Sequence, residues 1–319
     1  MNERWKALLA KGGPFLGLLL VIGLFALPAE TRATFLSYYN FKIIFTQTVI
    51  VAIGALGMTM IIVSGGIDLS VGSSIAFTSV VGALLIQKGW GAAAVCVAMI
   101  ASGGLIGLVN GAAIAGLRMT PFIITLGTLS IGRGAAQLLA DNQTVNYDAS
   151  PVNGWMTTVD PFSYALPAGV WVTLALAVLT SLLLKQTVFG RHVFAIGSNE
   201  QTARLCGVPT VRLKVVIYAL AGCFFGLAGV FQLSRLRQGD PTVAAGLELD
   251  IIASVIIGGA SLNGGVGTIL GSMIGAFIMA VLRNGSQQMG WPTPVQQVII
   301  GLVIIVAVFL DRLRQGRQN

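Results

Sequence analysis

The chain has 319 residues, of which 55% are hydrophobic and only 9% are charged, and its mean hydropathy is +0.86. A soluble domain carries about 25% charged residues, so this composition excludes a soluble globular domain and predicts an all-α, polytopic membrane protein. The net charge of +8 mostly reports orientation in the membrane, and no basic surface is interleaved with aromatic residues, so nucleic acid is excluded as a partner.

Uncharged runs long enough to cross about 30 Å of hydrocarbon predict ten transmembrane helices within one domain over residues 1–319, and counts of nine or eleven stay open. We expect the first run to be a retained helix rather than a signal peptide, because many more spans follow. The eighth span begins near Ala244, which places Glu248 and Asp250 at its outer end, and the motif GGASLNGGVG separates it from the ninth. The other spans are about Pro14–Ala29, Ile43–Ser64, Val71–Gln87, Gly91–Gly116, Pro121–Ala140, Ala165–Leu184, Val215–Ser234, Val266–Leu282 and Pro294–Leu310.

Ten spans place both termini on one side of the membrane, and the positive-inside rule predicts that this side is cytosolic. The loop at residues 141–164 then lies outside. Lys and Arg are biased about two to one toward the inner side: Arg4, Lys6, Lys11, Arg118, Lys185, Arg191, Arg204, Arg212, Lys214, Arg312, Arg314 and Arg317 lie inside, whereas Arg32, Lys42, Lys88, Arg235, Arg237 and Arg283 lie outside.

Glycines recur at i, i+4 and i+8 in two predicted spans, and a shorter pair occurs in the seventh. This spacing lets helix backbones approach closely in lipid, so we interpret it as packing. The ladders are Gly103, Gly107 and Gly111; Gly267, Gly271 and Gly275; and Gly222 and Gly226. The two Gly-Gly turns, GGIDLSVG and GGASLNGGVG, suggest an internal repeat. Their spacings to the following Asn-Gly pairs differ, so the sequence alone does not establish the repeat.

The longest polar interruption on the predicted cytosolic side is residues 190–214. Ser198 is the predicted N-cap of a short helix, with Gln201 completing an S-x-x-Q capping box. Gly207 is predicted at the C′ position and Pro209 stops the helix. The helix, Asn199–Cys206, is a rod of roughly 12 Å.

Glu200 and Arg204 lie at i and i+4 in this helix and predict a weak ion pair. The segment is either an ordinary loop between spans or a docking element for a soluble partner. The candidate docking residues are Ser198, Asn199, Glu200, Ala203, Arg204 and Gly207.

Asp68 is the most conspicuous polar residue between two long apolar runs. It either caps a turn before the third helix or marks a transport pathway. Arg133, about eight residues inside the fifth span, either lines a wet cavity or snorkels to a carboxylate or carbonyl group. Ser70 and Asn263, in the two Gly-Gly turns, are further candidates for the pathway or a gate.

Glu248 and Asp250 lie near Arg235 and Arg237, with which they form either ion pairs or a docking rim. We therefore add Asp250 to the pathway candidates. His192 lies in a solvated basic stretch and is interpreted as a bystander.

Several catalytic and binding motifs are missing from the sequence. It has no G-x-x-x-x-G-K-[ST] motif, which excludes ATP binding through a P-loop in this chain. It has no H-E-x-x-H, G-x-S-x-G or Cys/His cluster, so neither a hydrolase nor a metal site is predicted. Three scattered cysteines argue against disulfides. We expect a chain with no cofactor and no enzymatic activity of its own.

Four long motifs resemble the permease subunits of bacterial ABC sugar importers, nearest to the ribose type with xylose, arabinose, galactoside and autoinducer-2 relatives. The resemblance covers nearly the whole chain. The motifs are SGGIDLSVGS (Ser64–Ser73), PFIITLGTLSIGRG (Pro121–Gly134), GRHVFAIGSNEQTARLCGVPTVRLK (Gly190–Lys214) and GLELDIIASVIIGGASLNGGVGTILG (Gly246–Gly271).

This resemblance implies a homodimer of permeases in the lipid of the inner membrane. It also implies a cytosolic sugar-type ATPase that binds ATP and Mg, and a periplasmic sugar-binding protein. The family couples to its ATPase through the loop between the sixth and seventh spans, which is residues 197–212 here. An ion-coupled secondary transporter and a permease for a non-sugar ligand such as autoinducer-2 stay as alternatives.

Overall fold

The computed structural model describes residues 3–148, 150–157 and 166–315 and is almost entirely helical. The remaining positions, which include part of the predicted outer loop and Ala165, lie outside the described residues. The helices are α1 (Glu3–Ala26), α2 (Ala29–Phe35), α3 (Tyr38–Val63), α4 (Val71–Gln87), α5 (Ala92–Gly116), α6 (Pro121–Leu139), α7 (Gly154–Thr157), α8 (Ala168–Gln186), α9 (Val188–Ser198), α10 (Glu200–Leu205), α11 (Thr210–Leu236), α12 (Leu247–Ile257), α13 (Ile269–Gln288) and α14 (Thr293–Gln315). Two short strands, β1 (Val145–Asn146) and β2 (Gln238–Gly239), pair antiparallel.

Each of the ten predicted spans has a helix at its place. Six of the described helices, α3, α5, α6, α8, α11 and α13, are long and apolar enough to cross a membrane. Shorter apolar helices lie at 12–26, 71–87 and 293–306. These findings confirm an all-α, polytopic membrane protein.

The eighth span is shorter than the sequence predicted. It does not begin near Ala244 but at Leu247, because Ala244 and Gly246 have φ values of 61° and 80° that interrupt the helix. It ends at the Gly258–Gly259 turn after 11 residues. At 1.5 Å per residue this is roughly 17 Å, about half of the hydrocarbon thickness. Helix α12 is therefore a half-length helix.

Helix α3 lies at the centre of the bundle. In its most apolar window, 94% of the residues are buried within the structure, whereas the corresponding window of α6 is only 11% buried. A helix that is apolar on all sides suits a position surrounded by other helices. Helices α8, α11, α12 and α13 pack around α3.

The predicted glycine ladders are packing surfaces, except at Gly267, which precedes α13 instead of lying in it. A Cβ atom on Gly107 would overlap the carbonyl group of Tyr218, and one on Gly103 would overlap Gly222, so α5 and α11 touch backbone to backbone. On the other side of the bundle, Gly271 and Gly275 lie against Gly258 and Ser254 in the same manner. Close approach at small residues is how helices associate where lipid gives no hydrophobic drive between them.

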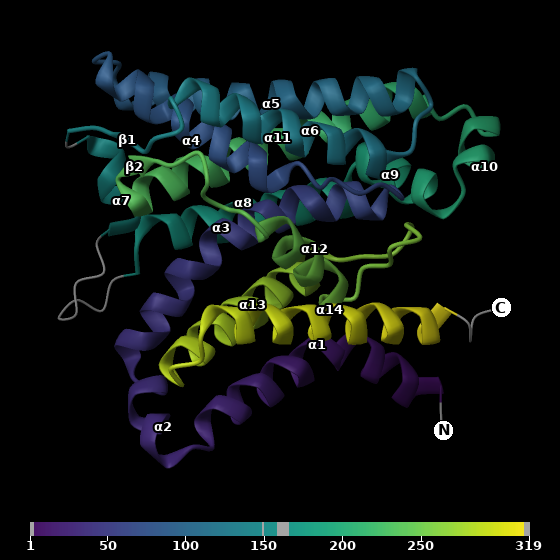
Figure 1. The fold of residues 1–319 in the computed structure, drawn as a ribbon. Coiled ribbons are helices and arrows are strands. Elements are labelled where there is room, and N and C mark those ends of the chain that lie inside the picture. Colours follow the sequence, from purple (N-terminus) through teal and green to yellow (C-terminus); the bar gives the residue numbers. More distant parts are fainter. Residues whose placement is uncertain (1–2, 149, 158–165, 316–319) are drawn as a thin grey trace.

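Figure 1 shows the long helices running side by side between two ends of the molecule. Helix α10 lies at one end, where α1 starts and α14 finishes, and α7 lies at the other end with the β1–β2 pair. We call these the α10 end and the α7 end. The start of α1 and the end of α14 therefore share the end that carries the predicted docking segment, as expected for an even number of spans.

Candidate functional site

The polar segment at the α10 end folds as two helices rather than one. Helix α9 ends at Ser198, and the N-cap of α10 is Asn199, whose side chain accepts a hydrogen bond from the Thr202 amide at 2.9 Å. The prediction that Ser198 is the N-cap was therefore wrong. Asn and Ser are similarly good N-caps, and the buried Val193 and Ile196 hold α9 in place up to its last turn. Helix α10 has six residues instead of the predicted eight.

The other end of α10 is as predicted. Gly207 has a φ of 85° at the C′ position. The Gly207 amide donates to the Arg204 carbonyl oxygen and the Val208 amide donates to that of Ala203, both at 3.1 Å. These two bonds form a Schellman motif, which requires a left-handed residue at C′. The sequence therefore sets the direction in which the chain leaves α10.

The predicted Glu200–Arg204 pair does not form. Glu200 instead accepts a hydrogen bond from the Lys214 ammonium group of α11 at 2.6 Å. Ala203 is buried against the rest of the segment, so α10 is fixed by one ion pair and one apolar contact face. The sequence-based candidates missed Leu205, whose residue surface is 88% exposed. The presence of an apolar residue on a short polar helix could have identified Leu205 from the sequence.

A basic recess lies beside α10. It is a cavity of about 440 Å³ between α10, the start of α11 and the turn between α5 and α6. Arg118, Arg204 and Lys214 line it together with the single carboxylate of Glu200. The recess carries an excess of positive charge, and an acidic side chain is the group that it would accept best.

The two Gly-Gly turns meet at the end of α9. The Gly265 amide donates to the Val63 carbonyl oxygen at 2.8 Å, and Gly197 fits between these two groups with no space for a Cβ atom. Gly65 and Gly264 lie against Gly197, and Gly265 lies against Ser198. We call this contact the glycine junction. The glycine junction joins the predicted docking segment directly to both turns. The sequence had related the two turns only as a suggested internal repeat.

Asp68 lies at the centre of a buried network. Its carboxylate accepts hydrogen bonds from the amide and the hydroxyl group of Ser70, at 2.8 and 2.6 Å, which is an Asx turn before α4. The Asn110 amide group of α5 donates to Asp68 at 3.3 Å and to the Ser70 hydroxyl oxygen at 3.0 Å. The Thr128 hydroxyl group of α6 donates to Asn110 at 2.6 Å. Asp68 therefore has the turn role, and its network also links three helices.

Asn263 lies in the second Gly-Gly turn, where its amide donates to the Ser261 hydroxyl oxygen at 3.2 Å. Its carbonyl oxygen lies near Gly65 of the first turn. Asn263 thus belongs to the glycine junction.

Arg133 binds carbonyl groups, one of the two kinds of partner that snorkelling predicted. Its guanidinium group donates to the carbonyl oxygens of Pro241 and Val243, at 2.9 and 2.7 Å. Both acceptors lie in residues 240–246, which connect β2 to α12 and which we call the strap. Asp240 stiffens the start of the strap by accepting from the amide and hydroxyl groups of Thr242. Arg133 thus holds the strap from α6.

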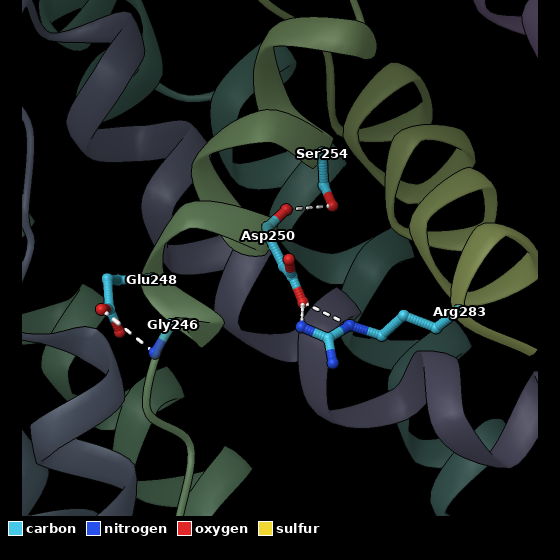
Figure 2. Close-up of polar contacts among 5 residues, drawn as sticks. All are labelled: Gly246, Glu248, Asp250, Ser254 and Arg283. Atoms are coloured by element: carbon cyan, nitrogen blue, oxygen red, sulfur yellow. Dashed lines mark hydrogen bonds and ion pairs between the residues drawn. The ribbon is translucent and has the colours of Figure 1, made fainter. Parts of the chain in front are cut away.

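Asp250 forms an ion pair with Arg283 of α13, as Figure 2 shows. The Nε atom of Arg283 lies 2.7 Å from the Asp250 carboxylate, and its Nη2 atom contacts the same oxygen. The predicted partners Arg235 and Arg237 do not pair with Asp250. Glu248 points away from this pair and accepts from the Gly246 amide at the start of α12.

These residues form two groups. The glycine junction and α10 lie together at the α10 end, whereas Arg133, the strap and the Asp250–Arg283 pair cluster around the start of α12. No group of three metal-ligating side chains occurs in the described part of the chain. The arrangement has the predicted docking segment at one end, a polar cluster farther along the bundle, and tightly packed helices between them.

Comparisons with known proteins show the family to which the chain belongs. Residues 40–308 match the family described as branched-chain amino acid transport system / permease component. The ribose import permease protein RbsC of Bacillus subtilis (strain 168) is 38% identical over 98% of this chain and 96% of its own length. RbsC of Escherichia coli (strain K12) is 35% identical over 93% of both chains. The L-arabinose transport system permease protein AraH of the same strain is 35% identical over 94% of this chain and 90% of its own. No solved structure matches the chain.

Proposed function

This chain belongs to the branched-chain amino acid transport system / permease component family, and we propose that it is the membrane-spanning permease subunit of an ABC importer that carries a monosaccharide across the bacterial inner membrane. Its relatives named for ribose and L-arabinose match along nearly their whole length, which supports a pentose or a related sugar as the cargo. An ion-coupled secondary transporter is not favoured, because the family is one of transport-system permease components. Nor is a non-sugar cargo such as autoinducer-2 favoured, since the relatives described above are named for sugars.

A permease of this kind works with two soluble proteins, a cytosolic ATPase and a periplasmic sugar-binding protein. The ATPase would bind ATP and Mg, since this sequence has no P-loop. We propose that the α10 end is the cytosolic end and that a second copy of this chain completes a homodimer. The homodimer rests on the resemblance to sugar permeases.

The glycine junction is the observation that carries the proposed mechanism. The docking residues Asn199, Glu200 and Ala203 begin within a few residues of Gly197, which touches both Gly-Gly turns through backbone atoms. A displacement of α10 by the ATPase would therefore reach the start of α4 and the end of α12 without passing through flexible side chains. Two packed arrangements of these helices would give alternating access.

At α10, the exposed Leu205 and the basic recess would receive the ATPase. An apolar anchor beside a charged recess provides both burial and orientation at an interface. Around the start of α12, we propose that Asp250 and Arg133 control the pathway, whereas Asp68, Ser70 and Asn263 hold the turns that move.

The direct test is a complex of this permease with its ATPase and sugar-binding protein, reconstituted in proteoliposomes. ATP hydrolysis and uptake of radiolabelled sugar are measured across a panel that includes D-ribose and L-arabinose. We expect one sugar-loaded binding protein to stimulate both activities. ATP-independent uptake driven by an ion gradient would contradict the proposal, and so would the absence of stimulation by every sugar.

A further inference from the structure

A second cavity lies between α3, α11, α12 and α13 and has a volume of about 230 Å³. Three carboxamide side chains from three different helices line it: Gln47 of α3, Gln232 of α11 and Gln287 of α13. The Asp250–Arg283 pair and Arg235 also line the cavity, together with apolar side chains of α3, α13, the strap and the start of α12. We call this cavity the glutamine pocket.

The glutamine pocket is lined by a buried polar atom that has no hydrogen-bond partner within the described chain. Gln232 is only 8% exposed and lines the cavity. The side-chain oxygen of Gln47 is buried and lacks a hydrogen-bond partner among the described residues. Buried polar groups in native proteins are nearly always hydrogen-bonded. The unpaired oxygen of Gln47 and the carboxamides of Gln232 and Gln287 around the same cavity would gain hydrogen bonds from a polar molecule bound there.

The lining defines the chemistry of that molecule. A carboxamide offers both a donor and an acceptor, which matches a hydroxyl group, since a hydroxyl group also does both. Asp250 and Arg283 neutralise each other, so the pocket is not built around a strongly charged ligand. Ile50, Val51 and Met279 supply an apolar wall suited to carbon–hydrogen groups. Drug-sized ligands fill cavities of about 300–1,000 Å³, so this smaller cavity suits a smaller molecule.

We infer that the glutamine pocket binds the sugar during its passage through the permease, with the carboxamides of Gln47 and Gln232 bonding to sugar hydroxyl groups. This inference rests on the proposed sugar transport. It adds a cargo site inside the membrane domain and a ligand class, a neutral polyhydroxylated molecule of monosaccharide size.

The position of the glutamine pocket fits a site that opens and closes. Ala244 and Ala245 form part of its wall, and they follow directly after Val243, one of the strap residues that Arg133 holds. Asp250 lines the pocket from α12, whose far end leads to the glycine junction. A shift of α12 would therefore change the pocket wall and the docking end together.

The test compares Gln232→Met and Gln47→Met with the native chain in the reconstituted complex. Methionine has nearly the shape of glutamine but makes no strong hydrogen bond. Uptake of radiolabelled D-ribose and L-arabinose is measured in the same vesicles as ATP hydrolysis. We expect each variant to transport roughly two- to tenfold fewer sugar molecules per ATP, the effect of one lost hydrogen bond, while loaded binding protein still stimulates hydrolysis.

Gln137→Met is the matched control, because Gln137 lies in α6 and does not line the glutamine pocket. It should transport as the native chain does. Native-like uptake by both pocket variants would overturn the inference while leaving sugar transport intact. A parallel loss of hydrolysis and uptake in both variants would overturn it as well, because it would indicate a defect in assembly or coupling. Absence of uptake by the native complex would instead refute the proposed function and the inference with it.

Discussion

The amide of Gly265 donates a hydrogen bond to the carbonyl oxygen of Val63 across 2.8 Å, although about two hundred residues separate them in the chain. This bond ties the end of the central helix α3 to the turn that follows α12, and Gly197 of α9 fills the space beside it. Three segments that the sequence places far apart are thereby held as one backbone contact at the α10 end.

Gly197→Ala tests the glycine junction. A Cβ atom at this position would overlap the Val63 carbonyl oxygen and the Gly265 amide, so the segments must separate. We expect a loss of about 1–3 kcal/mol in stability, typical of overpacking, and a strong reduction in uptake. Thermal melting of the purified permease and uptake in vesicles measure the two effects. Gly127→Ala is the control, since a Cβ atom there meets nothing within 4 Å; equal behaviour of the two variants would contradict the prediction.

Gly207→Val tests the end of α10. A β-branched residue is strongly disfavoured at a φ of 85°, so the chain should leave α10 in another direction and misplace Leu205. Space is not the cause, because a Cβ atom at Gly207 meets nothing within 4 Å. Gly207→Asn should therefore retain most activity, since Asn tolerates left-handed backbone. The measurement is ATP hydrolysis stimulated by loaded binding protein, and an equal loss in both variants would count against the backbone explanation.

The Glu200–Lys214 ion pair is testable by charge exchange. Glu200→Lys places two cations together and should weaken coupling to the ATPase, whereas adding Lys214→Glu restores the pair in reverse order. Both side chains are partly exposed, so we expect less than about 1 kcal/mol in stability from the pair itself. Stimulated ATP hydrolysis of the single and double variants gives the comparison. A double variant as impaired as the single one would mean that Glu200 contacts the ATPase directly.

Removing one member of the Asp250–Arg283 pair should have unequal consequences. Asp250 is 1% exposed, so Arg283→Met leaves a buried carboxylate with no cation, which is more costly than the neutral Asp250→Asn. The Arg283→Met/Asp250→Asn double variant should recover part of the stability lost in Arg283→Met. Thermal melting of the four proteins forms a double-mutant cycle. Additive effects would show that the two side chains do not interact.

The orientation can be tested with single cysteines. The native Cys206 is exposed at the end of α10, and Lys88→Cys places a thiol in the exposed turn between α4 and α5. After the other cysteines are replaced by Ser, an impermeant thiol reagent applied outside intact cells should label position 88 and not position 206. Membranes turned inside out should give the opposite pattern. Labelling of both from the outside would contradict the ten-span orientation.

Features that depend on a few neighbouring residues could be read from the sequence. The apolar runs predicted the helices of the bundle, since a membrane requires about twenty apolar residues per span regardless of their neighbours. The left-handed Gly207 and the Asx turn of Asp68 were predictable for the same reason, because a C′ glycine and a turn aspartate act within their own turn. The glycine spacing of α5 indicated a packing face but not which helix would fill it.

Only the tertiary structure decided the contacts between segments that are distant in the chain. Asn199 is the N-cap instead of Ser198 because buried residues of α9 extend that helix through Ser198. Glu200 pairs with Lys214 instead of Arg204 because α11 brings the Lys214 ammonium group within 2.6 Å. Asp250 pairs with Arg283 and not with Arg235 or Arg237, which are nearer in sequence. The two Gly-Gly turns pack against each other. In each case local propensity permits several partners of similar free energy, and the packing of whole helices determines which partner lies within reach.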